Sequence, residues 1–399
     1  MASSVTALGV LLVLPAVCAL LLRWARCPGW SVLGGVIGGM VVGPTVFGRV
    51  APAEFERLFV GGAAQRQALD ELERRQGADV LAGEAARLGA GEMARLREGH
   101  AREWARTRRA VEEARWSHQE PLRVYGLTVT GLVLVGAGLL KVGEGDRRQG
   151  MIGASSIGLW SAAFPGALGF AAMARLWGYG MAESVLAAAA VGIGPWVLTE
   201  VDRRAADEAE SGGAHMMERA GRIASGFAIA GAIGAMWAER GATGLLLGTV
   251  PAAMVIGWVL PGPGRKVQGF VRGVLKCAVV PTLAGCVAMK VEWYEDFALW
   301  PLVVFVILSG DGRWVGAFLG AMLPGGRRGL RTMRLVLGSA ACGPTQLAVA
   351  GIGAHTWMLP GEIVMALLAG AVMVEVTTPV RRSMASRLAK TEEELDEMG

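Results

Sequence analysis

Few side chains in this sequence have the type and spacing that catalysis or metal binding requires. The four histidines do not form a pair at a ligand spacing such as H-x-x-x-H, which makes a zinc site improbable. The five cysteines also lack metal-ligand spacing, and the GPGRK segment at 262–266 lacks the spacing of a phosphate-binding loop. We therefore expect no metal, no cofactor and no enzymatic activity.

The residues that could do chemistry are instead ionisable groups within or beside long apolar segments. Arg313, with Asp311 two residues before it, interrupts the apolar run that begins near 297. A charge inside a membrane-spanning helix is costly and by default functional, although Arg313 could also mark a loop after a shorter helix. Glu183, Glu200 and Glu375 are the candidate ion-binding carboxylates, although each is more often a helix-terminal or interfacial residue.

The elements that must position these groups are membrane-spanning helices. Hydrophobic residues make up 53% of the 399 residues and charged residues only 18%, a composition typical of an integral membrane protein. Apolar windows of about 18 to 25 residues are long enough to cross a bilayer as helices. We expect an all-α polytopic protein with eleven spans, at 5–22, 31–48, 122–141, 150–174, 179–199, 219–238, 242–260, 270–290, 297–323, 334–354 and 358–380.

Lys and Arg in the short loops predict the orientation of the chain. Alternate loops hold basic pairs such as Arg147 and Arg148, or Arg203 and Arg204, whereas the opposite loops hold few basic residues. By the positive-inside rule, the N-terminus lies outside and the C-terminus lies in the cytoplasm, as in a bacterial-type inner membrane.

A polar insertion at 61–120 separates the first two spans from the rest. Acidic and basic residues alternate in it, as on a solvated helix with ion pairs between residues four apart. We expect a helical hairpin or a short coiled coil, either as a charged extension without chemistry or as the site of a protein partner. The predicted organisation is spans one and two in 1–60, the insertion in 61–120, the remaining spans in 121–383 and an acidic cytoplasmic tail in 384–399.

The second span is unusually rich in glycine. Its sequence, GGVIGGMVVGP, contains small residues spaced four apart, which let helix backbones approach closely in lipid. The final Gly-Pro is expected to end the helix. The residues expected to serve helix packing and termination are Gly35, Gly39, Gly43 and Pro44.

The order of these motifs resembles the monovalent cation:proton antiporter superfamily, in its sodium/hydrogen exchanger and potassium-efflux branches. The similarity lies in CPGWSVLGGVIGGMVVGPTVFGRVAP near the N-terminus and in the segment from LSGDGRWVGAF to VEVTTPVRR near the C-terminus. The resemblance implies an inverted-repeat fold in which two discontinuous helices cross near the membrane midplane around an ion site. It also implies a homodimer that exchanges Na⁺ or K⁺ for H⁺ by alternating access.

The resemblance places the helix breaks at VGIGPWVLTE, 191–200, and ACGPTQLAVA, 341–350. It gives Arg313, with Asp311 beside it, the role of compensating the dipoles of the broken helices. The residues of the implied ion site are Gly192, Gly194, Pro195, Thr199, Ser225, Gly343, Pro344, Thr345 and Gln346.

One feature departs from the family pattern and leaves two hypotheses. The family binds its ion at acidic residues on the helix that follows the first break, but the 219–238 segment has none and carries Ser225 near that position. The first hypothesis is a cation:proton antiporter that uses another carboxylate. The second is a non-exchanging protein of the same fold that acts as a subunit, scaffold or sensor through its 61–120 insertion.

Overall fold

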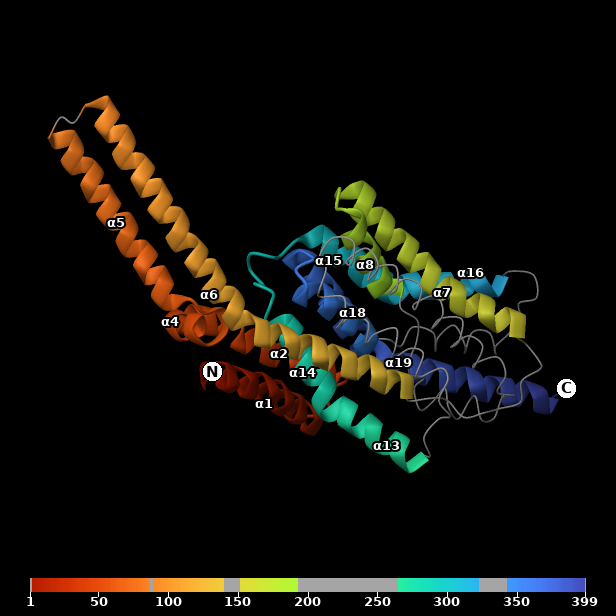
Figure 1. Ribbon diagram of the computed structural model, residues 1–399. Helices are drawn as coiled ribbons and strands as arrows, with labels where there is room; N and C mark the ends of the chain where they lie inside the picture. Colours follow the sequence, from red (N-terminus) through yellow and green to blue (C-terminus); the bar gives the residue numbers. More distant parts are fainter. Residues whose placement is uncertain (1, 87–88, 140–150, 193–264, 323–342, 399) are drawn as a thin grey trace. The chain divides into compact units, whose positions relative to one another are not determined.

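The computed structural model describes residues 2–86, 89–139, 151–192, 265–322 and 343–398, which are mostly helical with no strand among them (Figure 1). Five segments of the described part are long and apolar enough to cross a bilayer: Thr6–Trp24, Trp30–Val50, Gly269–Ala288, Leu299–Gly320 and Gly361–Leu388. The predictions of an all-α fold and of a helical membrane protein are therefore confirmed. The five segments correspond to five of the eleven predicted spans.

The remaining predicted spans are covered unevenly by the described residues. The 122–141 span falls in the last part of helix α6, Ala90–Leu139, and the 150–174 span in α7, Met151–Ala171. Helix α8, Met181–Gly192, covers the first part of 179–199, and α18, Gly343–His355, covers the last part of 334–354. The predicted spans 219–238 and 242–260 lie outside the described residues.

The chain divides into two compact units, and the first contains residues 1–10 and 46–125. Its elements after the N-terminal segment are α3 (Phe47–Val50), α4 (Pro52–Phe55), the π-helical turn η1 (Glu56–Val60), α5 (Ala63–Ala85) and α6 up to Tyr125. Helices α5 and α6 lie antiparallel (Figure 1). Polar contacts join them, because the indole Nε1 of Trp104 donates to Glu73 at 2.9 Å and Gln76 donates to the His100 carbonyl at 3.1 Å.

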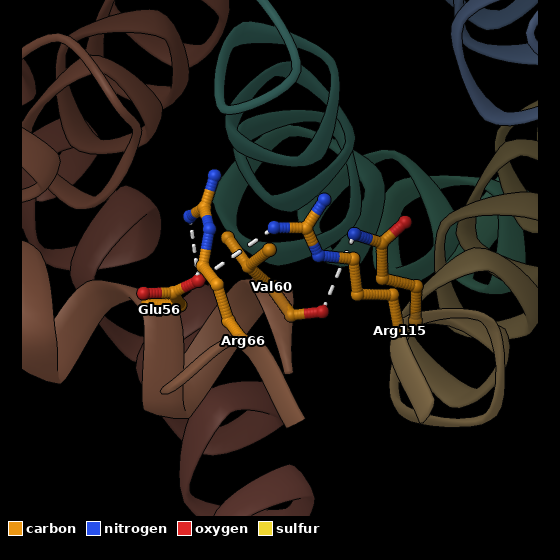
Figure 2. A network of polar contacts seen from close by, with 5 residues as sticks. Glu56, Val60, Arg66 and Arg115 are labelled. Atoms are coloured by element: carbon orange, nitrogen blue, oxygen red, sulfur yellow. Dashed lines mark hydrogen bonds and ion pairs between the residues drawn. The ribbon is translucent and has the colours of Figure 1, made fainter. Parts of the chain in front are cut away.

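We call the helical pair formed by α5 and α6, residues 63–120, the arm. Polar contacts fix the base of the arm to η1 (Figure 2). The Glu56 carboxylate accepts a hydrogen bond from Arg66 of α5 at 2.7 Å and lies 3.7 Å from Arg115 of α6. Gly61 and Gly62, at φ of +77° and +75°, turn the chain from η1 into α5, a conformation that residues with a Cβ rarely adopt.

The second unit contains residues 11–45 and 126–399. Its described helices are the rest of α1 (Ala2–Trp24), α2 (Trp30–Val42), the end of α6, α7, α8, α13 (Arg265–Val274), α14 (Val280–Ala288), α15 (Leu299–Ile307), α16 (Arg313–Met322), α18 and α19 (Gly361–Met398). Three π-helical turns lie among them: η2 (Ala172–Leu176), η4 (Leu275–Val279) and η5 (Leu308–Gly312).

The glycines of α2 face two neighbouring helices. A Cβ at Gly38 would lie 2.6 Å from the Cα of Pro15 on α1, whereas a Cβ at Gly35 would lie 2.6 Å from the Cβ of Ala284 on α14. Gly34 also faces α1, one turn before Gly38, and Gly39 also faces α14, one turn after Gly35. Helix α2 therefore packs between α1 and α14 with its backbone close to both.

The core of the second unit is formed by α7, α8, α14, α18 and α19, which pack on one another and on the α15–α16 segment. Helix α18 is buried along its length except at Pro344, which is half-buried. A Cβ at Gly351 would lie 3.2 Å from side-chain carbons of Leu283 and Val287 on α14. Helix α18 is continuous over residues 343–350 of the second predicted break, and the rest of that predicted break, 341–342, lies outside the described residues.

Candidate functional site around Arg313

The candidate site lies where a continuous helical segment changes its winding. Helices α15 and α16 run end to end through η5, a π-helical turn with the sequence LSGDG. The Ser309 hydroxyl donates to the Phe305 carbonyl at 2.6 Å within this turn. Short π-helical turns inside α-helices occur frequently at functional sites, because the wider turn redirects the side chains that follow.

Arg313 is the first residue after this turn, and its side chain is 1% exposed. Its Nη2 atom donates to the carbonyl oxygen of Val191 at 2.7 Å. Val191 precedes Gly192, the last residue of α8 that the structure describes. The buried guanidinium therefore joins the α15–α16 segment to α8.

The burial of Arg313 decides between the two interpretations of this residue. A loop residue would be exposed and outside regular structure, whereas Arg313 is helical and almost fully buried. Asp311, in contrast, is exposed. The buried charge therefore belongs to the helix packing of this site, and the neighbouring carboxylate points away from it.

Gln346 forms a second, uncharged part of the site. Its side chain on α18 is fully buried, and Nε2 donates to the Ser309 hydroxyl at 2.7 Å and to the Leu367 carbonyl of α19 at 3.0 Å. A Cβ at Gly370 would lie 3.0 Å from Nε2, so the glycine gives this amide its space. The Oε1 atom is buried and has no hydrogen-bond partner among the described residues.

The first described residue of α18, Gly343, is close to a carboxylate. A Cβ built there would lie 3.0 Å from Oε1 of Glu375 and 2.9 Å from the Ala371 carbonyl. The same glutamate lies beside Gly29, whose Cβ would be 3.1 Å from that of Glu375. Glu375 is half-buried on α19, between the N-cap of α2 and Gly343 of α18.

The other predicted site residues are distributed as follows. Thr345 is 3% exposed beside Gln346. Glu183 is half-buried in the first turn of α8, where its carboxylate lies against Gly180, at the opposite end of this helix from Val191. The predicted residues that lie outside the described part of the chain are Gly194, Pro195, Thr199, Glu200 and Ser225.

Sequence reasoning missed Ser309 and the backbone carbonyls of Val191 and Leu367. Ser309 carried a usable signal, because a small polar residue directly before Gly-Asp-Gly-Arg interrupts an apolar run. The two carbonyls carried no signal at all, since every residue has one and only packing decides which of them meets a donor.

The site combines the buried Arg313 cation, the buried Gln346 amide and the Glu375 carboxylate beside Gly343. Among the described residues, no group of three His, Cys, Asp or Glu side chains could hold a metal ion. Searches against models of known protein families and against curated proteins find no match to the chain. The proposal below therefore depends on the site itself and on the sequence resemblance.

Proposed function

We propose that this protein is a secondary active transporter of the cation:proton antiporter type, which exchanges Na⁺ or K⁺ for H⁺. The observation that carries the proposal is the buried Arg313 guanidinium, which donates to the Val191 carbonyl of α8 at 2.7 Å. Discontinuous helices that end inside the membrane leave dipole ends, and transporters use such ends with compensating charges to build ion sites.

In this proposal the two helices break where the resemblance places the breaks, so that α8 and α18 present opposite dipole ends. Arg313 contacts the Val191 carbonyl of α8, and the Glu375 carboxylate lies close to Gly343, the first described residue of α18. Glu375 is consequently the first candidate for the exchanged proton, because a carboxylate can hold either a proton or a cation. Glu183 and Glu200 rank below it, since Glu183 lies at the far end of α8 and Glu200 lies outside the described residues.

We further propose eleven spans in an inverted-repeat arrangement, with the N-terminus outside and the C-terminus in the cytoplasm of a bacterial-type cell. Contacts between segments that the sequence assigns to the same side support this alternation of loops, and the positive-inside rule gives which side is the cytoplasm. The predicted outer segments meet where the Trp293 amide donates to Thr45 at 3.2 Å and where Tyr179 donates to Glu362 at 2.6 Å. On the predicted inner side, Gly29 lies beside Glu375.

A non-exchanging role as a subunit, scaffold or sensor is the second candidate. The observation that favours it is the arm, which belongs to a compact unit of its own and is fixed at its base by the Glu56 contacts. A helical arm of this kind offers a surface for a protein partner. In the first proposal the same arm is an accessory element, and the transporter is a homodimer.

Proteoliposomes test the two proposals directly. Internal pH is followed with a trapped dye while Na⁺, K⁺ or Li⁺ is added outside. The antiporter proposal expects cation-dependent proton movement in the natural protein and a loss of about tenfold or more in Arg313→Ala. That magnitude follows because a hydrogen bond to a charged group contributes about 1.5–3 kcal/mol and each 1.4 kcal/mol is about tenfold in rate.

The matched control is Arg387→Ala, which removes an exposed arginine from α19. Its exchange rate should equal that of the natural protein, and size-exclusion profiles should show that all variants are folded. Absence of proton movement with all three cations over a range of pH would refute exchange and favour the non-exchanging role. Full activity of Arg313→Ala would refute the role of the buried guanidinium.

A further inference from the structure

Three chain segments meet around a group of acidic side chains at one end of the second unit. The segments are the loop 177–180 before α8, the loop 289–298 between α14 and α15, and the first turn of α19. The group, which we call the acidic cluster, consists of Tyr179, Glu292, Asp296 and Glu362. All four side chains are half-buried, and all lie in loops or at a helix start rather than within the candidate site.

Hydrogen bonds organise the acidic cluster. The Tyr179 hydroxyl donates to Oε1 of Glu362 at 2.6 Å, which connects the loop before α8 to the start of α19. Oδ2 of Asp296 accepts a hydrogen bond from the Glu292 amide at 2.7 Å, which fixes the carboxylate within its own loop. The other oxygen, Oδ1, lies against Gly361, where it occupies the space that a Cβ would fill.

The charges in the acidic cluster have one sign. Burial raises the pKa of Asp296, and the negative charges of Glu362 and Glu292 raise it further, against the lowering effect of the Glu292 amide. Tyr179 stays protonated, because burial and the bond to Glu362 raise its pKa to about 12. The cation in the same loop, Lys290, has its Nζ 4.7 Å from the ring centroid of Trp357.

We propose that the acidic cluster is a pH-sensitive contact, which holds the loop 289–298 against the start of α19 when Asp296 is protonated and weakens that contact when Asp296 ionises. A protonated carboxyl can lie close to Glu362 without repulsion and can donate a hydrogen bond to a neighbouring carboxylate. An ionised carboxylate in the same half-buried place is repelled by Glu362 and Glu292 and is partly desolvated. The proposal concerns the conformation of the outer loops and does not depend on transport.

The direction of the pH dependence follows from linkage. In the closed form the loop contacts α19, and this contact raises the pKa of Asp296 above its value in an exposed loop. Asp296 therefore binds its proton more tightly in the closed form than in the open form. The contact is therefore strongest at or below the ordinary aspartate pKa, about 3.9, and weakens as the pH rises above it. For a single proton, the ratio of closed to open forms falls by at most about tenfold per pH unit across the transition.

Hydrogen exchange of the full chain in detergent micelles, between about pH 4 and pH 8, tests this proposal. Amide protection in the 289–298 peptide, corrected for the intrinsic pH dependence of exchange, should fall with rising pH in the natural protein. Asp296→Asn keeps an acceptor for the Glu292 amide but cannot ionise, so its protection should be high and flat. Glu295→Gln, in the same loop and exposed, is the matched control and should follow the natural profile.

A second variant keeps the test decisive if Asp296→Asn does not fold. Glu362→Gln removes one of the charges that raise the pKa of Asp296, so the midpoint of the protection curve should shift to lower pH. A protection profile in the natural protein without pH dependence would overturn the proposal. A pH-dependent fall that persists unchanged in Asp296→Asn would also overturn it.

Discussion

Replacing Gly39 with alanine tests whether the close approach of α2 to α14 stabilises the fold. A Cβ at this position would lie 2.8 Å from the Cα of Gly285 and 2.8 Å from the Cβ of Ala288, closer than real Cβ atoms pack. One of these atoms belongs to the backbone of α14, which cannot move aside without shifting the helix. We therefore expect Gly39→Ala to separate the two helices and to destabilise the protein.

Two opposing effects set the size of the change in unfolding free energy. Overpacking of a well-packed interface costs about 1–3 kcal/mol, whereas alanine improves helix propensity over glycine by about 1 kcal/mol. The matched control is Gly273→Ala in α13, because a Cβ there meets no atom within 4 Å and only the propensity gain applies. The two variants should differ in unfolding free energy by about 1–3 kcal/mol, with Gly39→Ala the less stable.

Unfolding by SDS in mixed micelles, followed through the helical circular dichroism signal, measures this difference. Packing is the relevant force, because lipid and detergent tails remove the hydrophobic drive for helices to associate. If Gly39→Ala unfolds at the same SDS fraction as Gly273→Ala, the α2–α14 contact is not close in the folded protein. The same result would remove the reason for the glycine spacing in the second span.

Two other predictions concern the arm and the acidic cluster. Glu56→Gln weakens the ion pairs to Arg66 and Arg115, so limited proteolysis near Gly62 should become faster. The control Glu54→Gln changes an exposed residue of α4 and should leave the proteolysis rate unchanged. Equal proteolysis rates for the two variants would refute the conclusion that Glu56 fixes the base of the arm. Tyr179 should ionise near pH 12 in an ultraviolet titration. Its hydrogen bond to Glu362 needs the protonated phenol, so this contact should be lost as the pH rises from 10.0 to about 12. Glu362→Gln should return that titration towards 10.0, and an unchanged curve would contradict the hydrogen bond.

The sequence by itself determined the all-helical class and the places of five apolar spans. Apolar runs of bilayer length and the scarcity of charge within them predict helices, because an α-helix satisfies its own backbone in lipid. The runs at 5–22 and 297–323 accordingly match Thr6–Trp24 and Leu299–Gly320. Local composition also predicts a polar 61–120 insertion between apolar segments.

The sequence could nominate Arg313 and Gln346 as site residues but could not name their partners. Arg313 meets a carbonyl 122 positions earlier, and Gln346 meets a hydroxyl 37 positions earlier. Contacts of this kind depend on which helix faces pack together, and neither hydropathy nor motif spacing contains that information. The acidic cluster has the same origin, since Tyr179 and Glu362 are separated by 183 positions.

Only the tertiary structure decided that Arg313 is a buried residue rather than a loop residue. Both readings fit the same letters, LSGDGRWVGAF, because a charge within an apolar run can end a helix or lie inside it. The π-helical turn at Leu308–Gly312 continues the helix through the polar residues, and the Val191 carbonyl of α8 then supplies an acceptor. A buried charge is tolerated where a neighbouring element offers it a partner, and that condition is a property of the packed chain.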